Sequence, residues 1–140
     1  MALVEMEIDS IRVSSLHKDF RPIILHSKKG ERYLAIWEGL TEAEQISIKL
    51  QGITTPRPLT HDLFLSVIHV FGGNVDSIII SDLKGTTFYA KLILNIGEKK
   101  HEVDCRPCDA LALAVTAGAP ILAEEEVINK AAIPVGWKPS

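Results

Sequence analysis

Residues 75–104 read VDSIIISDLKGTTFYAKLILNIGEKKHEVD, and this stretch decides the fold class. It contains three runs rich in β-branched and apolar residues, at 75–82, 86–95 and 99–104. Lys84-Gly85 and Ile96-Gly97 separate these runs and suit short hairpin turns. We therefore predict an antiparallel meander, whose middle strand carries one apolar face made of Phe88, Ala90, Leu92 and Leu94.

The N-terminal part of the chain predicts further strands. Residues 3–10 alternate between apolar and acidic side chains, which is typical of a half-buried strand. The alternation slips near Ser10, which indicates a bulge or a second short strand. The runs 22–27 and 31–37 predict a hairpin with Gly30 in its turn.

Two helices are expected in the middle of the chain. Thr41 followed by Glu44 forms a capping-box pattern, so we expect a helix that starts there and ends near Gly52. A second helix is expected to start around Pro58 or Thr60 and to end at the glycines near residue 72. Its apolar stripe has the clearest helical period in the chain: Leu63, Phe64, Val67, Ile68 and Phe71.

The C-terminal part predicts two more helices around a short strand. Pro107 opens a helix that is apolar almost all round, and hence expected to be buried, with Gly118 as its C-cap. A short strand is expected at 120–123, and the acids at 124–126 suit the start of a last helix.

Hairpin strands with helices between them predict an α+β fold. We expect one domain over residues 1–132, with a mainly antiparallel or mixed β-sheet built from hairpins, three to four helices, and a loose C-terminal tail at 133–140. The alternation of strand and helix that marks a doubly wound fold is absent, as are the glycine patterns of nucleotide-binding loops and the GxSxG elbow.

Length and charge set limits on function. The chain has 140 residues, one ordinary domain, and a net charge of −3, which excludes coating nucleic acid by bulk charge but permits a local basic site. Two cysteines exclude a disulfide scaffold. No apolar run approaches the ~20 residues of a membrane span, and the start lacks the basic region of a signal peptide. We therefore expect a cytoplasmic protein without a membrane partner.

One polar pattern precedes two helices. Arg57-Pro58 is followed by Asp62, and Arg106-Pro107 by Asp109, each acid falling in a first helical turn. Helix capping explains such acids simply, because they accept bonds from free N–H groups. Helix N-termini also bind anions, and guanidinium groups bind phosphate bidentately. The pattern is thus compatible with structural capping and with a phosphate site.

A phosphodiesterase site would assign a role to each polar residue. The phosphate-binding candidates are Arg57, Arg106 and Thr60. The catalytic candidates are His61 as acid or base and Asp62, Asp104 and Asp109 as water-orienting groups. The three aspartates are also the candidate ligands of a divalent cation, Mg²⁺ or Mn²⁺.

Several blocks, read in order, resemble the bifunctional nuclease domain family. They are Trp37-x-Gly39-x-x-Glu42-Ala43 and residues 57–63, 87–90, 104–114 and 119–121, so the resemblance covers roughly residues 3–132. It implies a compact α+β domain, often a homo-oligomer, that hydrolyses phosphodiester bonds in DNA and RNA without strong sequence preference. This chain has Cys108 where the family usually has serine, and Thr116 near a position that is often arginine.

Three other interpretations remain open. The first is a non-catalytic binding or oligomerisation module that uses the paired motifs structurally. The second is a redox role for Cys105-Arg106-Pro107-Cys108, because a helix start is expected to lower the pKa of the first thiol. The third is a zinc site at the same cysteines, which would need two further ligands, with His61 and His101 as the nearest candidates.

Overall fold

Seven strands form one mixed sheet in the computed structural model, which describes residues 2–131 and 133. The predicted tail lies, apart from residue 133, outside the described residues. The strands are β1 (Leu3–Ile11), β2 (Phe20–Ser27), β3 (Tyr33–Gly39), β4 (Gly73–Lys84), β5 (Thr87–Ile96), β6 (Lys99–Cys105) and β7 (Ile121–Glu124). Their order in the sheet is β3-β2-β1-β7-β4-β5-β6. Only the β4–β7 pair is parallel, which confirms the predicted α+β class with a mixed sheet.

Local sequence signals set the hairpins. Gly85 and Gly97 have φ angles of 63° and 62° in the β4–β5 and β5–β6 turns, a left-handed conformation that glycine adopts without steric cost. The predicted β2–β3 hairpin forms in the same way around Gly30. The pairing of β1 with β2 shifts register between Ile8 and Ser10, so the bulge expected there is confirmed.

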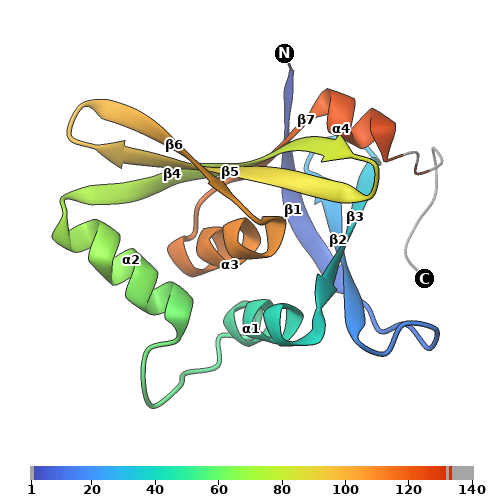
Figure 1. Ribbon diagram of the computed structural model, residues 1–140, viewed down its shortest axis with the longest axis horizontal. Helices are drawn as coiled ribbons and strands as arrows, with labels where there is room; N and C mark the ends of the chain where they lie inside the picture. The colour runs from blue at the N-terminus through green and yellow to red at the C-terminus, as the bar shows by residue number, and fades with distance from the viewer. Residues whose placement is uncertain (1, 132, 134–140) are drawn as a thin grey trace.

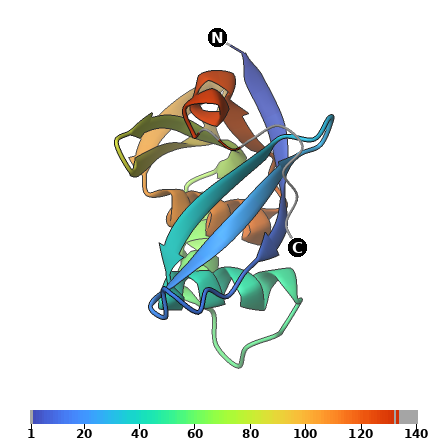
Figure 2. The same cartoon turned by 90° about the vertical axis from the view of Figure 1, so that its right-hand side faces the viewer.

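The described residues also form four helices: α1 (Leu40–Leu50), α2 (Thr60–Val70), α3 (Pro107–Ala117) and α4 (Glu125–Lys130). Figure 1 shows α1, α2 and α3 gathered on one side of the sheet, while α4 lies apart from them and packs on β4 and β7. Figure 2 shows the β2–β3 hairpin crossing the molecule at a steep angle to the other strands, as expected for a strongly twisted sheet. In the described part of the chain, every helix is too short or too polar to cross a membrane.

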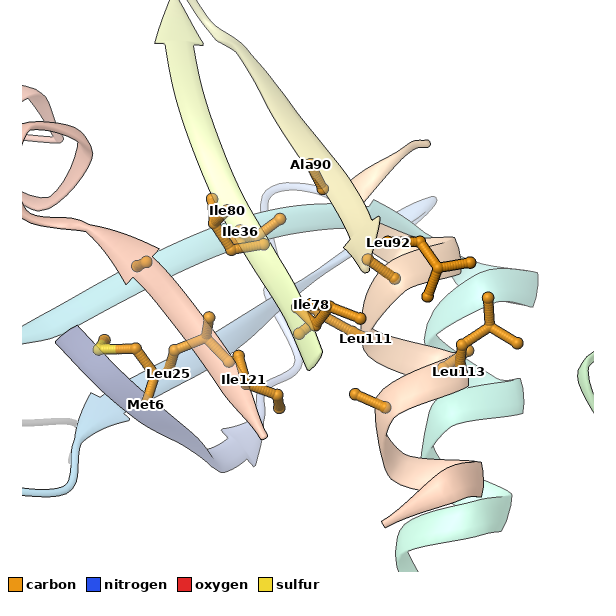
Figure 3. Close-up of a cluster of buried hydrophobic side chains, with 14 of the residues drawn as sticks. Met6, Leu25, Ile36, Ile78, Ile80, Ala90, Leu92, Leu111, Leu113 and Ile121 are labelled. Atoms are coloured by element: carbon orange, nitrogen blue, oxygen red, sulfur yellow. The ribbon is translucent and has the colours of Figure 1, made fainter. Parts of the chain in front are cut away.

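The core lies between the sheet and α3. As predicted, α3 starts at Pro107 and is buried along most of its length, and Gly118 caps it in the left-handed conformation. Figure 3 shows buried side chains of the sheet, among them Ile78 and Leu92, in one cluster with Leu111 and Leu113 of this helix. The start of α3 and the end of β3 line one cavity.

The capping box expected at Thr41 and Glu44 is wrong. The helix starts at Leu40, and Gly39 precedes it without a side-chain hydrogen bond to the helix end. The Leu40 N–H instead donates to the carbonyl oxygen of Asp19, 3.1 Å away in the segment before β2. A tertiary contact therefore satisfies one of the free N–H donors at the start of α1.

The apolar stripe of α2 does not face the core. An amphipathic helix ordinarily turns such a stripe inward. Here Leu65 and Ile68 are the buried residues of the helix. The rest of the stripe is exposed, and Val70 extends it: Leu63, Phe64, Val67, Val70 and Phe71.

Candidate functional site

Two adjoining cavities open where the end of β3, the start of α1 and the start of α3 meet. The larger has a volume of about 480 Å³ and the smaller about 220 Å³, and both are lined by Glu42, Arg106 and Cys108. The larger is also lined by Phe20, Trp37, Glu38, Thr87 and Phe88, and the smaller by Thr41, Gln45, Thr60, His61 and Asp109. We call this pair of cavities the groove.

Gly39 gives Glu42 its place in the groove. A Cβ atom added at Gly39 would lie 2.5 Å from Glu42 Oε2, so a larger residue there would displace this carboxylate from its position beside Gly39. This contact gives a physical reason for the spacing of glycine and glutamate in the first block of the resemblance, Trp37-x-Gly39-x-x-Glu42. The glycine and the acid are packed against each other across the start of α1.

Arg106 and Asp109 form a bidentate ion pair at the start of α3. Arg106 Nε donates to Asp109 Oδ2 at 2.8 Å, and Nη2 donates to Oδ1 at 2.9 Å. The remaining nitrogen, Nη1, lies 3.9 Å from Glu42 Oε1. The hydrogen bonds to Asp109 raise the pKa of Arg106 further above its ordinary value. The side chain is still 65% exposed, so its outer edge is open to an anion in the groove.

His61, in the first turn of α2, also lines the groove. Its Nε2 lies 3.9 Å from Asp109 Oδ1, and its side chain is 15% exposed. Thr60 precedes it and lines the smaller cavity. The starts of α2 and α3, which share the Arg-Pro pattern, therefore converge through His61 and Asp109.

Glu38 is the most perturbed acid in the groove. It follows Leu34 and Ile36 on the inward face of β3, so its carboxyl group is partly buried where it lines the groove. Burial raises its pKa to about 7, and the carboxylates of Glu42 and Asp109 add to the rise. A hydrogen bond with Cys108 and the charge of Arg106 act in the opposite direction. The group therefore exchanges its proton near neutral pH.

Four of the seven predicted site residues meet in the groove, namely Thr60, His61, Arg106 and Asp109. The other three lie elsewhere. Asp62 Oδ2 accepts a hydrogen bond from the Leu59 N–H at 2.8 Å, and Oδ1 accepts one from Lys49 Nζ. Asp62 thus caps α2, as the structural interpretation of the motif predicted, and these bonds, that to Lys49 first, lower its pKa.

Arg57 and Asp104 lie outside the groove. Arg57 is exposed in the loop before α2 and lines neither cavity. Asp104 is exposed near the end of β6, and the next residue, Cys105, packs against the core. Because successive strand residues point to opposite faces, Asp104 points away from the helices.

The predicted metal ligands do not come together. Within residues 2–131 and 133, no three His, Cys, Asp or Glu side chains are arranged to hold a metal ion. The groove carboxylates of Glu42 and Asp109 already face the Arg106 guanidinium. The described residues do not support a zinc site at Cys105 and Cys108 either.

The two cysteines are free thiols with raised pKa values. Burial is the main cause, and it raises the pKa of Cys105 to about 11 and that of Cys108 to about 12. Carboxylates add to both shifts, Asp104 and Asp109 at Cys105 and Glu38 and Asp109 at Cys108. The expectation that the helix start lowers the pKa of the first thiol is therefore wrong, because burial and acids outweigh the helix dipole.

Sequence reasoning missed Glu38, and it used Glu42 and Trp37 only as parts of a matched block. Glu38 follows an ordinary strand pattern, and no local signal marks its burial. Glu42 and Trp37 could have been found from their spacing around Gly39, since a glycine at the end of a strand often marks a close approach of neighbouring groups.

Comparison with known proteins supports one family. A family model described as bifunctional nuclease domain matches residues 23–136. Two uncharacterized proteins from two strains of Mycobacterium tuberculosis are each 38% identical to this chain over 130 residues. The aligned region is 92% of this chain and 76% of each of these proteins.

Proposed function

This chain belongs to the bifunctional nuclease domain family, and we propose that it cleaves phosphodiester bonds of DNA and RNA in the groove at the start of α3. The observation that carries the proposal is the placement of Arg106 where the two cavities join, with Glu38 lining one and His61 lining the other. The Arg106 guanidinium, which can bind phosphate, thus lies between two side chains capable of proton transfer.

Arg106 is the phosphate-binding residue. Asp109 fixes the orientation of its guanidinium through two hydrogen bonds, so little side-chain freedom remains to be lost when a phosphate binds. The charge lies at the start of α3, where unpaired backbone N–H groups favour an anion as well. Phosphate binding there needs no bulk positive charge, in keeping with a net charge of −3.

Glu38 and His61 are the proton-transfer residues. Cleavage needs one group to take a proton from the attacking oxygen and another to give a proton to the leaving oxygen. A carboxyl group with a pKa of about 7 can do either at neutral pH. Imidazole is the side chain used most often for this purpose, and Nε2 of His61 lies 3.9 Å from the Asp109 carboxylate.

Trp37 and Phe20 provide a place for a nucleobase. Both line the larger cavity beside Arg106, and their side chains are about half exposed, at 47% and 51%. Aromatic faces bind unpaired bases of any sequence by stacking, which agrees with an activity that has little sequence preference. A base can reach them only when it is unpaired, so single-stranded substrates should be cleaved faster than duplexes.

The use of a divalent cation in cleavage remains a prediction from the sequence motifs. Because Glu42 and Asp109 face Arg106, we assign no step to Mg²⁺ or Mn²⁺ at this groove. Asp62 and Asp104 have no part in the proposed chemistry, since one caps α2 and the other points away from the groove.

The experiment compares two arginines that have the same sequence context but different places in the fold. Purified wild type, Arg106→Ala and Arg57→Ala are incubated with labelled RNA, single-stranded DNA and duplex DNA, each with Mg²⁺, with Mn²⁺ and with EDTA. We expect Arg106→Ala to lose about 100-fold or more in cleavage rate, the usual effect of removing a charged ligand of the transition state. Arg57→Ala should keep nearly the full rate.

Two controls make the result decisive. Thermal melts of both variants show whether lost activity reflects lost folding, and Arg106 is exposed enough for the substitution to be tolerated. Equal cleavage by all three proteins would indicate a contaminating nuclease or another site. Binding of single-stranded nucleic acid without any cleavage would favour the non-catalytic module.

A further inference from the structure

The two cavities of the groove meet at Arg106 and differ in what else lines them. Glu38 and the aromatic side chains of Trp37 and Phe20 line the larger cavity. His61 lines the smaller cavity, whose other side chains include three neutral polar ones: Thr41, Gln45 and Thr60. A phosphate held by Arg106 therefore borders an aromatic cavity that contains a carboxyl group and a polar cavity that contains an imidazole.

Cleavage of a phosphodiester needs proton transfer at two places. The attacking and leaving oxygens lie on opposite sides of the phosphorus, roughly in line with it. Two proton-transfer groups in one cavity would both serve the same side. Glu38 and His61 line different cavities, so one of them can act on the attacking oxygen and the other on the leaving oxygen.

The larger cavity is the place for a nucleoside. Its volume of about 480 Å³ lies within the range of small-molecule sites, whereas the volume of about 220 Å³ of the smaller cavity falls below that range. The half-exposed rings of Trp37 and Phe20 provide surfaces on which a base can stack. With the base there and the phosphate at Arg106, the ribose that joins them lies in the cavity that Glu38 also lines.

A ribose in that position brings its own attacking oxygen. In RNA, the 2′-hydroxyl stands on the carbon next to the one that carries the 3′-phosphate, so covalent bonds hold the nucleophile near the phosphorus. Such an intramolecular attack avoids the cost of binding and orienting a water molecule. With a pKa of about 7, Glu38 is ionised in about half of the molecules at neutral pH and can accept the hydroxyl proton.

We propose that, in RNA, the larger cavity holds the nucleoside on the 5′ side of the cleaved bond, and that the 2′-hydroxyl of this nucleoside is the attacking oxygen. The inference rests on the proposed function, to which it adds the nucleophile and the orientation of the substrate. DNA has no 2′-hydroxyl and has to use water, so it is cleaved more slowly in the same groove.

The step is balanced by the two proton-transfer residues. The 2′-oxygen forms a bond to phosphorus, and its proton passes to the Glu38 carboxylate. The bond between phosphorus and the 5′-oxygen of the next nucleoside breaks, and protonated His61 gives its proton to that oxygen. The products are a 2′,3′-cyclic phosphate and a free 5′-hydroxyl, while Arg106 holds the same single negative charge of the phosphate before and after the step.

The first test uses a DNA strand that contains one ribonucleotide. Wild type, Glu38→Gln and Arg57→Ala are incubated with this strand, with the same strand carrying a 2′-O-methyl ribonucleotide, and with the all-DNA strand, and mass spectrometry identifies the product ends. We expect wild type to cleave the bond 3′ to the ribonucleotide and to leave a 2′,3′-cyclic phosphate. The other two strands should be cleaved there at least about 100-fold more slowly, because the nucleophile is blocked or absent.

The variants separate this activity from a contaminating ribonuclease. Glu38→Gln should lose about 100-fold or more in rate, the usual effect of removing a general base. Arg57→Ala, purified in the same way, should keep nearly the full rate, because Arg57 lines neither cavity. Thermal melts show that each variant is folded.

Two modified substrates test the orientation in the groove. With sulfur in place of the leaving 5′-oxygen, the leaving group needs no proton, so His61→Gln should regain nearly the wild-type rate while Glu38→Gln stays slow. Removing the base of the ribonucleotide, with its 2′-hydroxyl kept, should slow cleavage by about 10-fold or more, because the stacking on Trp37 and Phe20 is lost. Removing the base on the 3′ side should have little effect.

The possible failures are distinguishable. Products with 3′-hydroxyl and 5′-phosphate ends, or equal cleavage of the 2′-O-methyl strand, would show that water attacks; the inference would then be wrong, and the proposed nuclease function would stand. A larger loss from removing the 3′ base, or recovery of Glu38→Gln instead of His61→Gln by the sulfur substrate, would reverse the orientation and overturn the inference. If folded wild type cleaves no strand, including all-RNA strands, both the proposed function and the inference fail.

Discussion

Replacing Glu38 by glutamine should make the protein's stability less dependent on pH. In the native groove, burial and two neighbouring carboxylates raise the pKa of Glu38 from 4.5 to about 7. In the unfolded chain, this carboxyl group returns to its ordinary value. Between about pH 4.5 and pH 7, the native state therefore holds a proton that the unfolded state has released, and the free energy of unfolding falls as pH rises. Above this window the loss is complete and constant.

The size of the effect follows from the shift. One pKa unit corresponds to 1.36 kcal/mol, so the full shift would set an upper limit of roughly 3 kcal/mol. The groove is open to water, and screening by solvent reduces the expected effect to about 1–2 kcal/mol. Glutamine is close in shape to protonated glutamate and carries no charge at any pH. The Glu38→Gln variant should thus match wild type near pH 5 and exceed its stability by about 1–2 kcal/mol near pH 8.

Urea unfolding at one fixed protein concentration measures this difference across about pH 5 to pH 9. Glu44→Gln is the matched control, because Glu44 is an exposed acid on α1 outside the groove. If the control gains stability with rising pH as Glu38→Gln does, the effect is not specific to the groove. If the gain from Glu38→Gln is also independent of pH, the carboxyl group is not perturbed in the native state, and its role in proton transfer loses its basis.

Three further predictions concern the residues around the groove. Asp62→Ala should lower the free energy of unfolding by about 1–2 kcal/mol, because α2 loses the carboxylate that caps its start, and urea unfolding measures this loss. Gly39→Ala should reduce cleavage more than it reduces thermal stability, since the new methyl group displaces the mobile end of Glu42 rather than backbone; unchanged cleavage would argue against a role for that carboxylate. The thiols of Cys105 and Cys108 should react with a thiol reagent at neutral pH at least about 10-fold more slowly in native than in unfolded protein, because their raised pKa values leave little thiolate. Fast native labelling of either would reopen the redox interpretation.

The sequence by itself determined the sheet hairpins and the buried third helix. Their signals are local: alternation of side chains, glycines such as Gly85 and Gly97 at turns, and Pro107 and Gly118 at the ends of a continuous apolar run. Turn geometry and side-chain period act over a few residues, so one sequence is enough to recognise them. The family resemblance was recognisable for a similar reason, because its blocks keep their order along the chain.

Only the tertiary structure decided which polar residues form a site. The motifs before α2 and α3 have the same Arg-Pro and aspartate, yet Asp62 turns back to cap its helix while Asp109 pairs with Arg106 and approaches His61. Whether such a carboxylate caps or enters a groove depends on which neighbours lie across from it, and those neighbours come from distant parts of the chain.

Burial is the physical quantity that the sequence could not supply. It raises the pKa of Glu38, a residue with no motif of its own, and reverses the expected pKa shift of the cysteines. It also separates the two apolar sides of α2, since the helical period fixes which residues share a side but not which side meets the core. Periodicity is a property of the chain, whereas burial is a property of the packing around it.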